Sequence, residues 1–260
     1  MTMGCVEVPQ PETEELRIVS LNPCSDAILA EIAPDKLAAV SHYSHDPAAS
    51  SLDVREARRW PATAGTVEEI AALDPDLVVA TTFLPPATAQ ALERLGYPVA
   101  RIGITATVEE SIAQIRELAA LADAKDAGEA LVAEIEDALA AAEGAGDPIP
   151  ALVWQAGGIV PGEGTLIVDL LRRTGFAHAA AARGLGQADR LGLEAVLADP
   201  PALILAAGSP TAEEDRALFH PVIDSAGIEQ RRLASNLLYC GGPTIIRAAE
   251  RLRAIREGIG

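Results

Sequence analysis

The sequence predicts an α/β protein built as two Rossmann-like α/β lobes that are joined by one long α-helix. Residues 67–80 read VEEIAALDPDLVVA and residues 193–206 read LEAVLADPPALILA, and the two stretches align without a gap. Each is typical of a short helix, an Asp/Pro turn and an apolar strand. Any two strand–helix units resemble each other to some degree, but this internal repeat favours two related lobes.

Residues 125–143 form the predicted link between the lobes. Their sequence, KDAGEALVAEIEDALAAAE, is rich in strong helix formers and places its apolar residues on one helix face. Such a helix would be about 28 Å long. The predicted organisation has four parts: a flexible N-terminal tail over 1–15, an N-terminal lobe over 16–124, the connecting helix over 125–143 and a C-terminal lobe over 144–260.

In the first lobe, apolar runs bounded by helix breakers predict alternating strands and helices. Strands are predicted at residues 17–21, 37–40, 77–80 and 99–104. Ser25 and Asp26 are N-cap candidates for a helix that ends at Ile32. Further helices are predicted at residues 68–73, 86–95 and 108–122. This alternation favours a mostly parallel sheet that is covered on both faces.

The second lobe shows the same alternation. Strands are predicted at residues 151–155, 203–206 and 237–240. Helices are predicted at residues 165–174, 193–197, 213–219 and 244–257. Thr165 can begin the first of these helices, and Gly175 suits the position just after its end.

Composition and charge narrow the class of protein. The 260 residues carry a formal net charge of −18, which argues against nucleic acid and anionic membrane surfaces as partners. No apolar run is long enough to span a bilayer. No signal peptide is recognisable, and a removed export signal is compatible with the sequence. The three cysteines do not form a disulfide framework, and Met-Gly before Cys5 is only faintly similar to a lipoprotein cleavage site.

Motifs of common catalytic sites are missing from the sequence, which contains no G-x-S-x-G, H-E-x-x-H, C-x-x-C or G-x-x-x-x-G-K-[ST]. The glycines of residues 157–164 do not spell the dinucleotide pattern G-x-G-x-x-G. His42 and His45 are weak candidate metal ligands, because they lie three apart in a loop that is equally compatible with a simply polar surface. Cys24 and Cys240 need no function as small buried residues.

Six segments, taken in order, resemble the periplasmic solute-binding proteins of ABC importers. They are RIVSLNPCSDAILAEI, VSHYSHDP, AGTVEEIAALDPDLVVA, the long connecting helix, GGIVPGEGTLIVDLLRRTGF and GGPTIIRAAERLRAI. The subgroup has a single helical connector and carries vitamin B12, heme and ferric siderophores, and the likeness is closest to vitamin B12-binding proteins. The resemblance implies two α/β lobes with a ligand cleft between them and a small hinge motion.

The resemblance also implies which residues contact the ligand. Loops at the strand ends face the cleft, which agrees with the rule that open α/β sheets bind ligands beyond the carboxyl ends of their strands. The residues that match these loops are Pro23, Cys24, Ser25, Tyr43, Gly65, Phe83, Leu84, Gly158, Ile159, Asn236, Tyr239 and Cys240. Tyr43 corresponds to an aromatic side chain that packs on the corrin. We expect Cys24 and Cys240 to remain free thiols, because a bridge would lock the lobes together.

The implied function is that of a periplasmic substrate-binding protein, and not of an enzyme. It would capture vitamin B12 or a related corrinoid as a monomer without a cofactor of its own, and deliver it to a membrane permease. B12 binders usually supply further cleft aromatics, whereas residues 63–65 and 186–192 contain none. A hydroxamate ferric siderophore or heme is therefore the alternative ligand. The alternative of another class is a metal-dependent enzyme that uses His42, His45 and Cys240.

Glu68 and Glu194 occupy the same place in the internal repeat, which puts one on the outer surface of each lobe. The resemblance implies that this pair docks onto arginines of the permease, where charge-assisted hydrogen bonds would form. Glutamate is also favoured at helix N-termini for local reasons, so two ordinary helix-start residues are the alternative.

Overall fold

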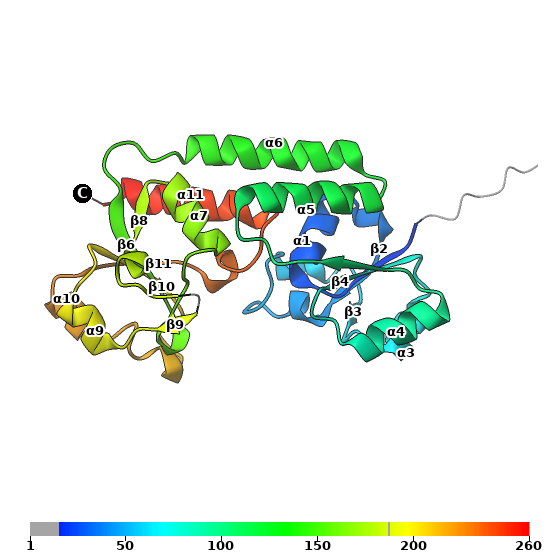
Figure 1. Ribbon diagram of the computed structural model, residues 1–260, viewed down its shortest axis with the longest axis horizontal. Helices are drawn as coiled ribbons and strands as arrows, with labels where there is room; N and C mark the ends of the chain where they lie inside the picture. Colours follow the sequence, from blue (N-terminus) through cyan, green and yellow to red (C-terminus); the bar gives the residue numbers. More distant parts are fainter. Residues whose placement is uncertain (1–15, 187, 260) are drawn as a thin grey trace, which may run out of the picture.

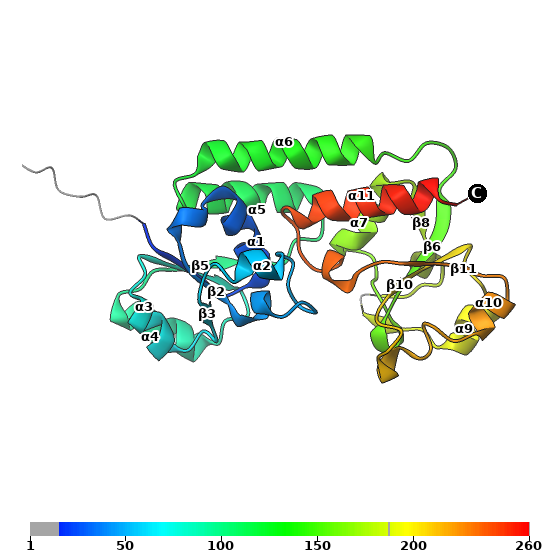
Figure 2. The same cartoon turned by 180° about the vertical axis from the view of Figure 1, so that it is seen from behind.

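Two parallel β-sheets, one in each lobe, form the frame of the molecule (Figures 1 and 2). The structure is a computed structural model that describes residues 16–186 and 188–259. The predicted α/β class with two lobes is confirmed. The predicted tail over residues 1–15, which includes Cys5, lies outside the described residues.

The first sheet has five parallel strands in the order β3-β2-β1-β4-β5. They are β1 (Ile18–Ser20), β2 (Leu37–Ser41), β3 (Ala62–Thr63), β4 (Leu77–Thr81) and β5 (Val99–Ile102). The central strands β1 and β4 are almost entirely buried apolar runs, as expected for parallel strands that are covered on both faces.

The second sheet has four parallel strands in the order β11-β10-β6-β8. They are β6 (Ile149–Gln155), β8 (Phe176–His178), β10 (Leu203–Ala207) and β11 (Glu229–Arg232). Strands β7 (Ile159–Val160) and β9 (Asp189–Arg190) form a separate antiparallel pair. The internal repeat is also present in the topology, because β4 lies between β1 and β5 just as β10 lies between β6 and β11.

The helices connect these strands. In the first lobe and the link they are α1 (Pro23–Ile32), α2 (Val54–Ala57), α3 (Val67–Leu73), α4 (Pro86–Leu95), α5 (Val108–Leu121) and α6 (Lys125–Ala141). The later helices are α7 (Leu166–Arg173), α8 (Ala179–Ala182), α9 (Leu193–Ala198), α10 (Val222–Ser225) and α11 (Thr244–Glu257). Among the described residues, no helix combines the length and the apolar character that a bilayer crossing requires.

Short 3-10 turns lie near several element ends. They are η1 (Pro34–Lys36), η2 (His42–His45), η3 (Ala156–Gly158), η4 (Glu213–Asp215) and η5 (Ser235–Leu237). Three of them, η2, η3 and η5, occupy loops that the sequence placed at the cleft.

Helix α6 fills most of the predicted connecting helix, and it packs against α5, α11 and α1. Figures 1 and 2 show α6, α5 and α11 as a layer along one side of the molecule, with both sheets on the other side of that layer. One apolar cluster runs through the layer and includes Ile18 and Ile115 of the first lobe and Leu205 and Ile245 of the second. The lobes therefore share a core, and each adds a separate cluster of its own.

Two predicted elements are wrong in the second lobe. Residues 237–240 are not the last strand, because they run from the last residue of η5 into a bend before α11, and the last strand is β11. Leu238 and Cys240 are buried, so their apolar character reflects packing without strand pairing. Residues 213–219 form only the short turn η4 where a helix was predicted.

The beginning of α1 also differs from the prediction. Its N-cap is Asn22, and neither Ser25 nor Asp26 has this role. The Asn22 side chain accepts a hydrogen bond from the amide of Cys24 at 2.7 Å, and Pro23 takes the first helical position, where a missing N–H has no cost. The Ser25 and Asp26 side chains are instead buried inside the lobe.

Candidate functional site

The main candidate site is a largely apolar cavity of about 360 Å³ between the lobes. Its first-lobe wall includes Asn22, Phe83 and Ile104, which follow β1, β4 and β5 in the chain. Its second-lobe wall includes Leu166, Leu238 and Tyr239. The first-lobe wall therefore lies beyond the carboxyl ends of parallel strands, where open α/β sheets bind ligands.

A second cavity, of about 560 Å³, lies beside the first and is more polar. Most of its lining comes from the second lobe and includes Gln155, Ser209, Glu214, Arg232 and Asn236. Pro47 and Ala48, which follow η2, bring the first lobe to the same cavity. Tyr239 lines both cavities, so its ring lies at their boundary.

Three exposed aromatic side chains lie in the predicted cleft loops, and Ile104, outside those loops, is exposed as well. Tyr43 is 52% exposed, Phe83 and Ile104 are each 74% exposed, and Tyr239 is 56% exposed. Large apolar side chains are rarely left in water without a partner, and grouped exposure of this kind is typical of ligand sites. The Tyr43 ring also stacks on His42, with ring centroids 4.0 Å apart.

The orientation of Tyr239 is fixed by a hydrogen bond. Its hydroxyl donates to Oε1 of Gln155 at 3.0 Å, which ties η5 and its following turn to the end of β6. Burial raises the pKa of the Tyr239 phenol, so the hydroxyl keeps its proton and remains a donor. The boundary between the two cavities is therefore held by one specific side-chain pair.

The cavities bring together only part of the predicted ligand-contact set. Cys24, Phe83 and Tyr239 line the apolar cavity, and Ile159, Asn236 and Tyr239 line the polar one. Sequence reasoning missed Ile104 and Leu238, which both line the apolar cavity. Ile104 carried a usable signal, because it is an apolar residue at the carboxyl end of the strand predicted at residues 99–104.

The other predicted contacts line neither of these two cavities; they are Pro23, Ser25, Tyr43, Gly65, Leu84, Gly158 and Cys240. Ser25 is fully buried, and its hydroxyl donates to the carbonyl of Asn22 at 3.2 Å. Gly158 is buried beneath Leu191, whose carbonyl would lie 2.9 Å from an added Cβ. The position of these two residues favours a structural role over direct ligand contact.

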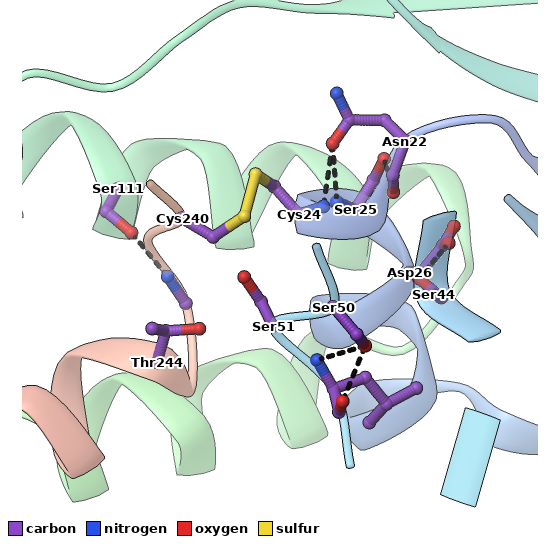
Figure 3. The surroundings of a disulfide bond; sticks show 12 residues. Asn22, Cys24, Ser25, Asp26, Ser44, Ser50, Ser51, Ser111, Cys240 and Thr244 are labelled. Carbon is purple, nitrogen blue, oxygen red and sulfur yellow. Dashed lines mark hydrogen bonds between the residues drawn. A yellow bond between two sulfur atoms is a disulfide. The ribbon is translucent and has the colours of Figure 1, made fainter. Parts of the chain in front are cut away.

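Cys24 and Cys240 form a disulfide, so the prediction of two free thiols is wrong. Their Cα atoms are 5.1 Å apart, within the range that a disulfide needs. Figure 3 shows the bridge between the first turn of α1 and the segment before α11, beside Ser111 of α5. The expected conflict with lobe movement does not arise at this place, because the lobes already share a packed core there.

The candidate metal ligands His42 and His45 are engaged elsewhere. His42 Nδ1 lies 3.3 Å from the carbonyl of Thr63, and His45 Nε2 lies 3.1 Å from the carbonyl of Ala57. Over residues 16–186 and 188–259, no group of three or more His, Cys, Asp or Glu side chains is arranged to hold a metal ion. Because the Cys240 sulfur is in a disulfide, it is not a thiolate ligand either.

Glu68 and Glu194 are both exposed in the first turns of α3 and α9. Figures 1 and 2 show α3 and α9 at the two outer ends of the molecule, on the side away from α6. The neighbouring Glu69 forms hydrogen bonds within the protein. Its carboxylate accepts from the Thr63 hydroxyl at 2.7 Å and from the Ala64 amide at 2.8 Å. These bonds lower the pKa of Glu69 and distinguish it from Glu68.

Comparison with known families decides the class of this protein. The periplasmic binding protein family matches residues 18–225, which cover most of both lobes. The chain belongs to this family. A periplasmic binding protein is a component of transport and not an enzyme, so the alternative of a metal-dependent enzyme is wrong. The periplasmic location expected from the sequence is that of the family.

Solved structures show the same fold at low sequence identity. The periplasmic heme-binding protein RhuT from Roseiflexus sp. RS-1 is 21% identical, with a TM-score of 0.74, and the match covers 92% of this chain and 97% of RhuT. The heme-binding protein HutB of Vibrio cholerae is 18% identical, with a TM-score of 0.74 and coverage of 94% and 99%. The vitamin B12-binding protein BtuF of Vibrio cholerae is 20% identical, with a TM-score of 0.67 and coverage of 93% and 98%. No curated protein matches the chain.

Proposed function

We propose that this periplasmic binding protein captures a corrinoid, vitamin B12 or a relative, and delivers it to the permease of an ABC importer. The observation that carries the proposal is the pairing of an apolar, aromatic cavity with a polar one across Tyr239. Corrinoids combine the same two kinds of surface, because a large, mostly apolar macrocycle carries a rim of polar amide side chains. Cavities of this size and character are typical of small-molecule sites.

The apolar part of the site suits a macrocycle face. Phe83, Ile104 and Tyr239 present apolar surface from loops of both lobes, and Tyr43 adds a further exposed ring on η2. Burying such surface against a flat, largely apolar ring system is favourable at roughly 25 cal/mol per Å². Aromatic rings also gain from offset stacking on another π-system.

The polar cavity favours an amide rim over a carboxylate rim. Gln155 and Asn236 offer amide donors and acceptors, and Glu214 and Asp215 add two carboxylates against the single guanidinium of Arg232. The excess of acidic groups disfavours the anionic propionates of heme and suits neutral groups that carry N–H donors. One oxygen of the buried Asp215 carboxylate, Oδ1, has no hydrogen-bond partner among the described residues.

Heme is the second candidate, and a different observation favours it. Tyr43 is exposed beside His42, and tyrosine and histidine both serve as heme-iron ligands in proteins. The solved structures that share the fold include heme-binding proteins from two organisms. A phenol at this position would supply an axial ligand that a corrinoid does not require.

Calorimetry with cyanocobalamin, dicyanocobinamide and hemin tests the proposal. We expect 1:1 binding of the corrinoids, and Tyr43→Ala and Tyr239→Ala should each weaken it about tenfold by removing stacked rings. Tyr97→Ala is the control, because Tyr97 packs against the separate outer core of the first lobe. A hemin complex with a shifted Soret band and no heat with either corrinoid would establish the second candidate instead. No binding of any of the three compounds would rule out both the corrinoid and the heme as ligands.

The same proposal includes docking to the permease through Glu68 and Glu194. Both carboxylates are exposed in first turns of equivalent helices, where they are favoured without an internal partner. The helices that bear them, α3 and α9, lie on one side of the molecule at opposite ends, which suits a two-point contact with a membrane protein (Figure 1). Arginines on the permease would complete bidentate pairs with them.

A further inference from the structure

Asp26 is a buried carboxylate that connects α1 to the turn that bears Tyr43. Its side chain is inaccessible to solvent, and its Oδ2 accepts two hydrogen bonds, one from the end of β2 and one from η2. The amide of Ser41 donates to it at 2.8 Å and the hydroxyl of Ser44 at 2.6 Å. Figure 3 shows Asp26 and Ser44 together, on the side of α1 away from the disulfide.

The two donors lie on either side of the exposed aromatic residues. Ser41 ends β2 and is the N-cap of η2, where its hydroxyl accepts from the amide of Tyr43 at 3.3 Å. Ser44 is the buried residue within η2, between the exposed Tyr43 and the half-buried His45. A turn that is held at Ser41 and Ser44 has little freedom left at the two residues between them, His42 and Tyr43.

A carboxylate in this position is costly for the fold. Burying a carboxyl group away from water is unfavourable unless hydrogen bonds compensate, and Oδ1 of Asp26 has no partner in the described chain. The groups that face it from β1, β2 and η2 are the Ser20 hydroxyl, the Ser41 amide and the Ser44 hydroxyl, and these carry no charge. A stable core alone would be served better by an apolar residue.

We infer that Asp26 is a positioning residue of the ligand site, which holds η2 in the geometry that presents Tyr43 and His42 to the ligand. The inference rests on the proposed function, because it assumes that Tyr43 contacts the ligand. It assigns to Asp26 a role that acts through Tyr43 and involves no contact of its own. A pre-organised loop raises affinity because less freedom is lost when the ligand binds.

Three variants on α1 and η2 test the role. Asp26→Ala removes both hydrogen bonds, Asp26→Asn keeps a side-chain acceptor of similar shape, and Ser44→Ala removes one bond with a small change in volume. Glu31→Ala is the matched control, because Glu31 is an exposed acid on the same helix. Cyanocobalamin and hemin are the probes. Asp26→Ala should lower the affinity for whichever of them binds the wild type by about tenfold. Asp26→Asn and Glu31→Ala should stay within about twofold.

A double-mutant cycle with Tyr43→Ala separates positioning from general stability. In the Tyr43→Ala background, Asp26→Ala or Ser44→Ala should cost no further affinity, because the residue through which they act is gone. An equal loss of affinity in both backgrounds would overturn the inference. Ser44→Ala keeps the cycle usable if Asp26→Ala fails to fold. In the protein that retains Tyr43, Ser44→Ala should lower the affinity roughly threefold.

Hydrogen exchange of the ligand-free protein tests the anchoring without any probe. The amide of Ser41 should exchange at least about tenfold faster in Asp26→Ala than in the wild type, and Asp26→Asn should retain protection. Unchanged exchange at Ser41 would contradict the inference. If neither probe binds the wild type, the proposed function fails by itself, and the exchange rates still decide whether Asp26 holds η2.

Discussion

Cys24 and Cys240 are joined by a disulfide that links the first turn of α1 to the segment before α11, across a sequence separation of 216. The bridge lies where the lobes already meet. The next residues reinforce it, because the amide of Gly242 donates to the hydroxyl of Ser111 in α5 at 2.8 Å. The two lobes are therefore connected covalently and by a hydrogen bond beside the apolar cavity, which Cys24 and Gly241 line.

Removing the disulfide should destabilise the protein substantially. The bridge closes a loop of 216 residues, for which the chain-entropy model gives about 5 kcal/mol. We expect the Cys24→Ser/Cys240→Ser variant to melt at a clearly lower temperature by calorimetry. In a Cys5→Ser background, the denatured and unreduced protein should show no free thiol. Two titratable thiols per chain would disprove the bridge.

Gly242 should not tolerate a side chain. Its φ is +61°, and an added Cβ would lie 2.4 Å from Cγ1 of Ile28 in the other lobe. Gly242→Ala therefore combines an unfavourable backbone conformation with overpacking, and should cost at least about 2 kcal/mol in urea unfolding. Gly146→Ala is the control, because Gly146 has a φ of +82° but no atom of the described chain other than its immediate neighbours lies within 4 Å of the added Cβ. Equal losses in the two variants would show that the contact with Ile28 is unimportant.

Asp26 should make stability depend on pH. Burial is the main cause that raises the pKa of Asp26, from 3.8 to about 7. A carboxyl whose pKa is higher in the folded state binds more protons there, so its contribution is complete below about pH 4 and is lost as the pH rises to about 7. At about 1.4 kcal/mol per pKa unit, the loss reaches at most roughly 4 kcal/mol.

Urea unfolding of the wild type and of Asp26→Asn across this range measures the effect. The difference between their free energies of unfolding should change steadily between about pH 4 and pH 7, in the direction that favours the wild type at low pH. Other carboxylates cancel in the difference because both proteins share them. A difference that is flat with pH would show that the Asp26 pKa is ordinary in the folded state.

Replacing Glu68 and Glu194 together with Ala should affect transport alone. Both side chains are exposed on α3 and α9, so ligand affinity and melting temperature should stay nearly unchanged. Uptake by the reconstituted importer should fall, because the charge-assisted bonds to the permease are lost. The control pair is Glu117→Ala with Glu134→Ala, two exposed glutamates on α5 and α6. Normal uptake by the Glu68/Glu194 variant would refute the docking proposal, and lost ligand binding would place these residues in the cleft.

Local sequence signals were sufficient for many of the elements. Helices α4 and α11 have the predicted bounds, because their helix formers, apolar spacing and flanking prolines or glycines all lie within or next to the segment. Strands β4 and β10 follow from apolar runs after Asp/Pro turns, and their equivalent places in the two sheets agree with the two related lobes that the internal repeat predicted. These signals act over a few residues, so the sequence contains them directly.

Elements that depend on a neighbour were missed. Strand β11 reads EQRR and has no apolar pattern, and it is a strand because the edge of β10 offers it hydrogen-bond partners. Residues 237–240 have an apolar pattern but pair with no strand of the described chain, so they form a turn in which Leu238 and Cys240 are buried and Tyr239 is exposed. Periodicity reports burial, whereas strand pairing requires a partner from elsewhere in the chain.

The sequence by itself determined the α/β class, the two related lobes and the long helix between them. Tertiary structure alone decided which loop residues meet. Cys24 and Cys240 were both expected at the cleft, but only the packing of α1 against the segment before α11 brings their Cα atoms within 5.1 Å. Asp26 likewise has the pattern of a helix cap, and becomes the anchor of η2 only because β2 ends beside α1. Caps and periodicity arise from neighbouring residues, whereas contacts between distant residues exist only once the whole fold has formed.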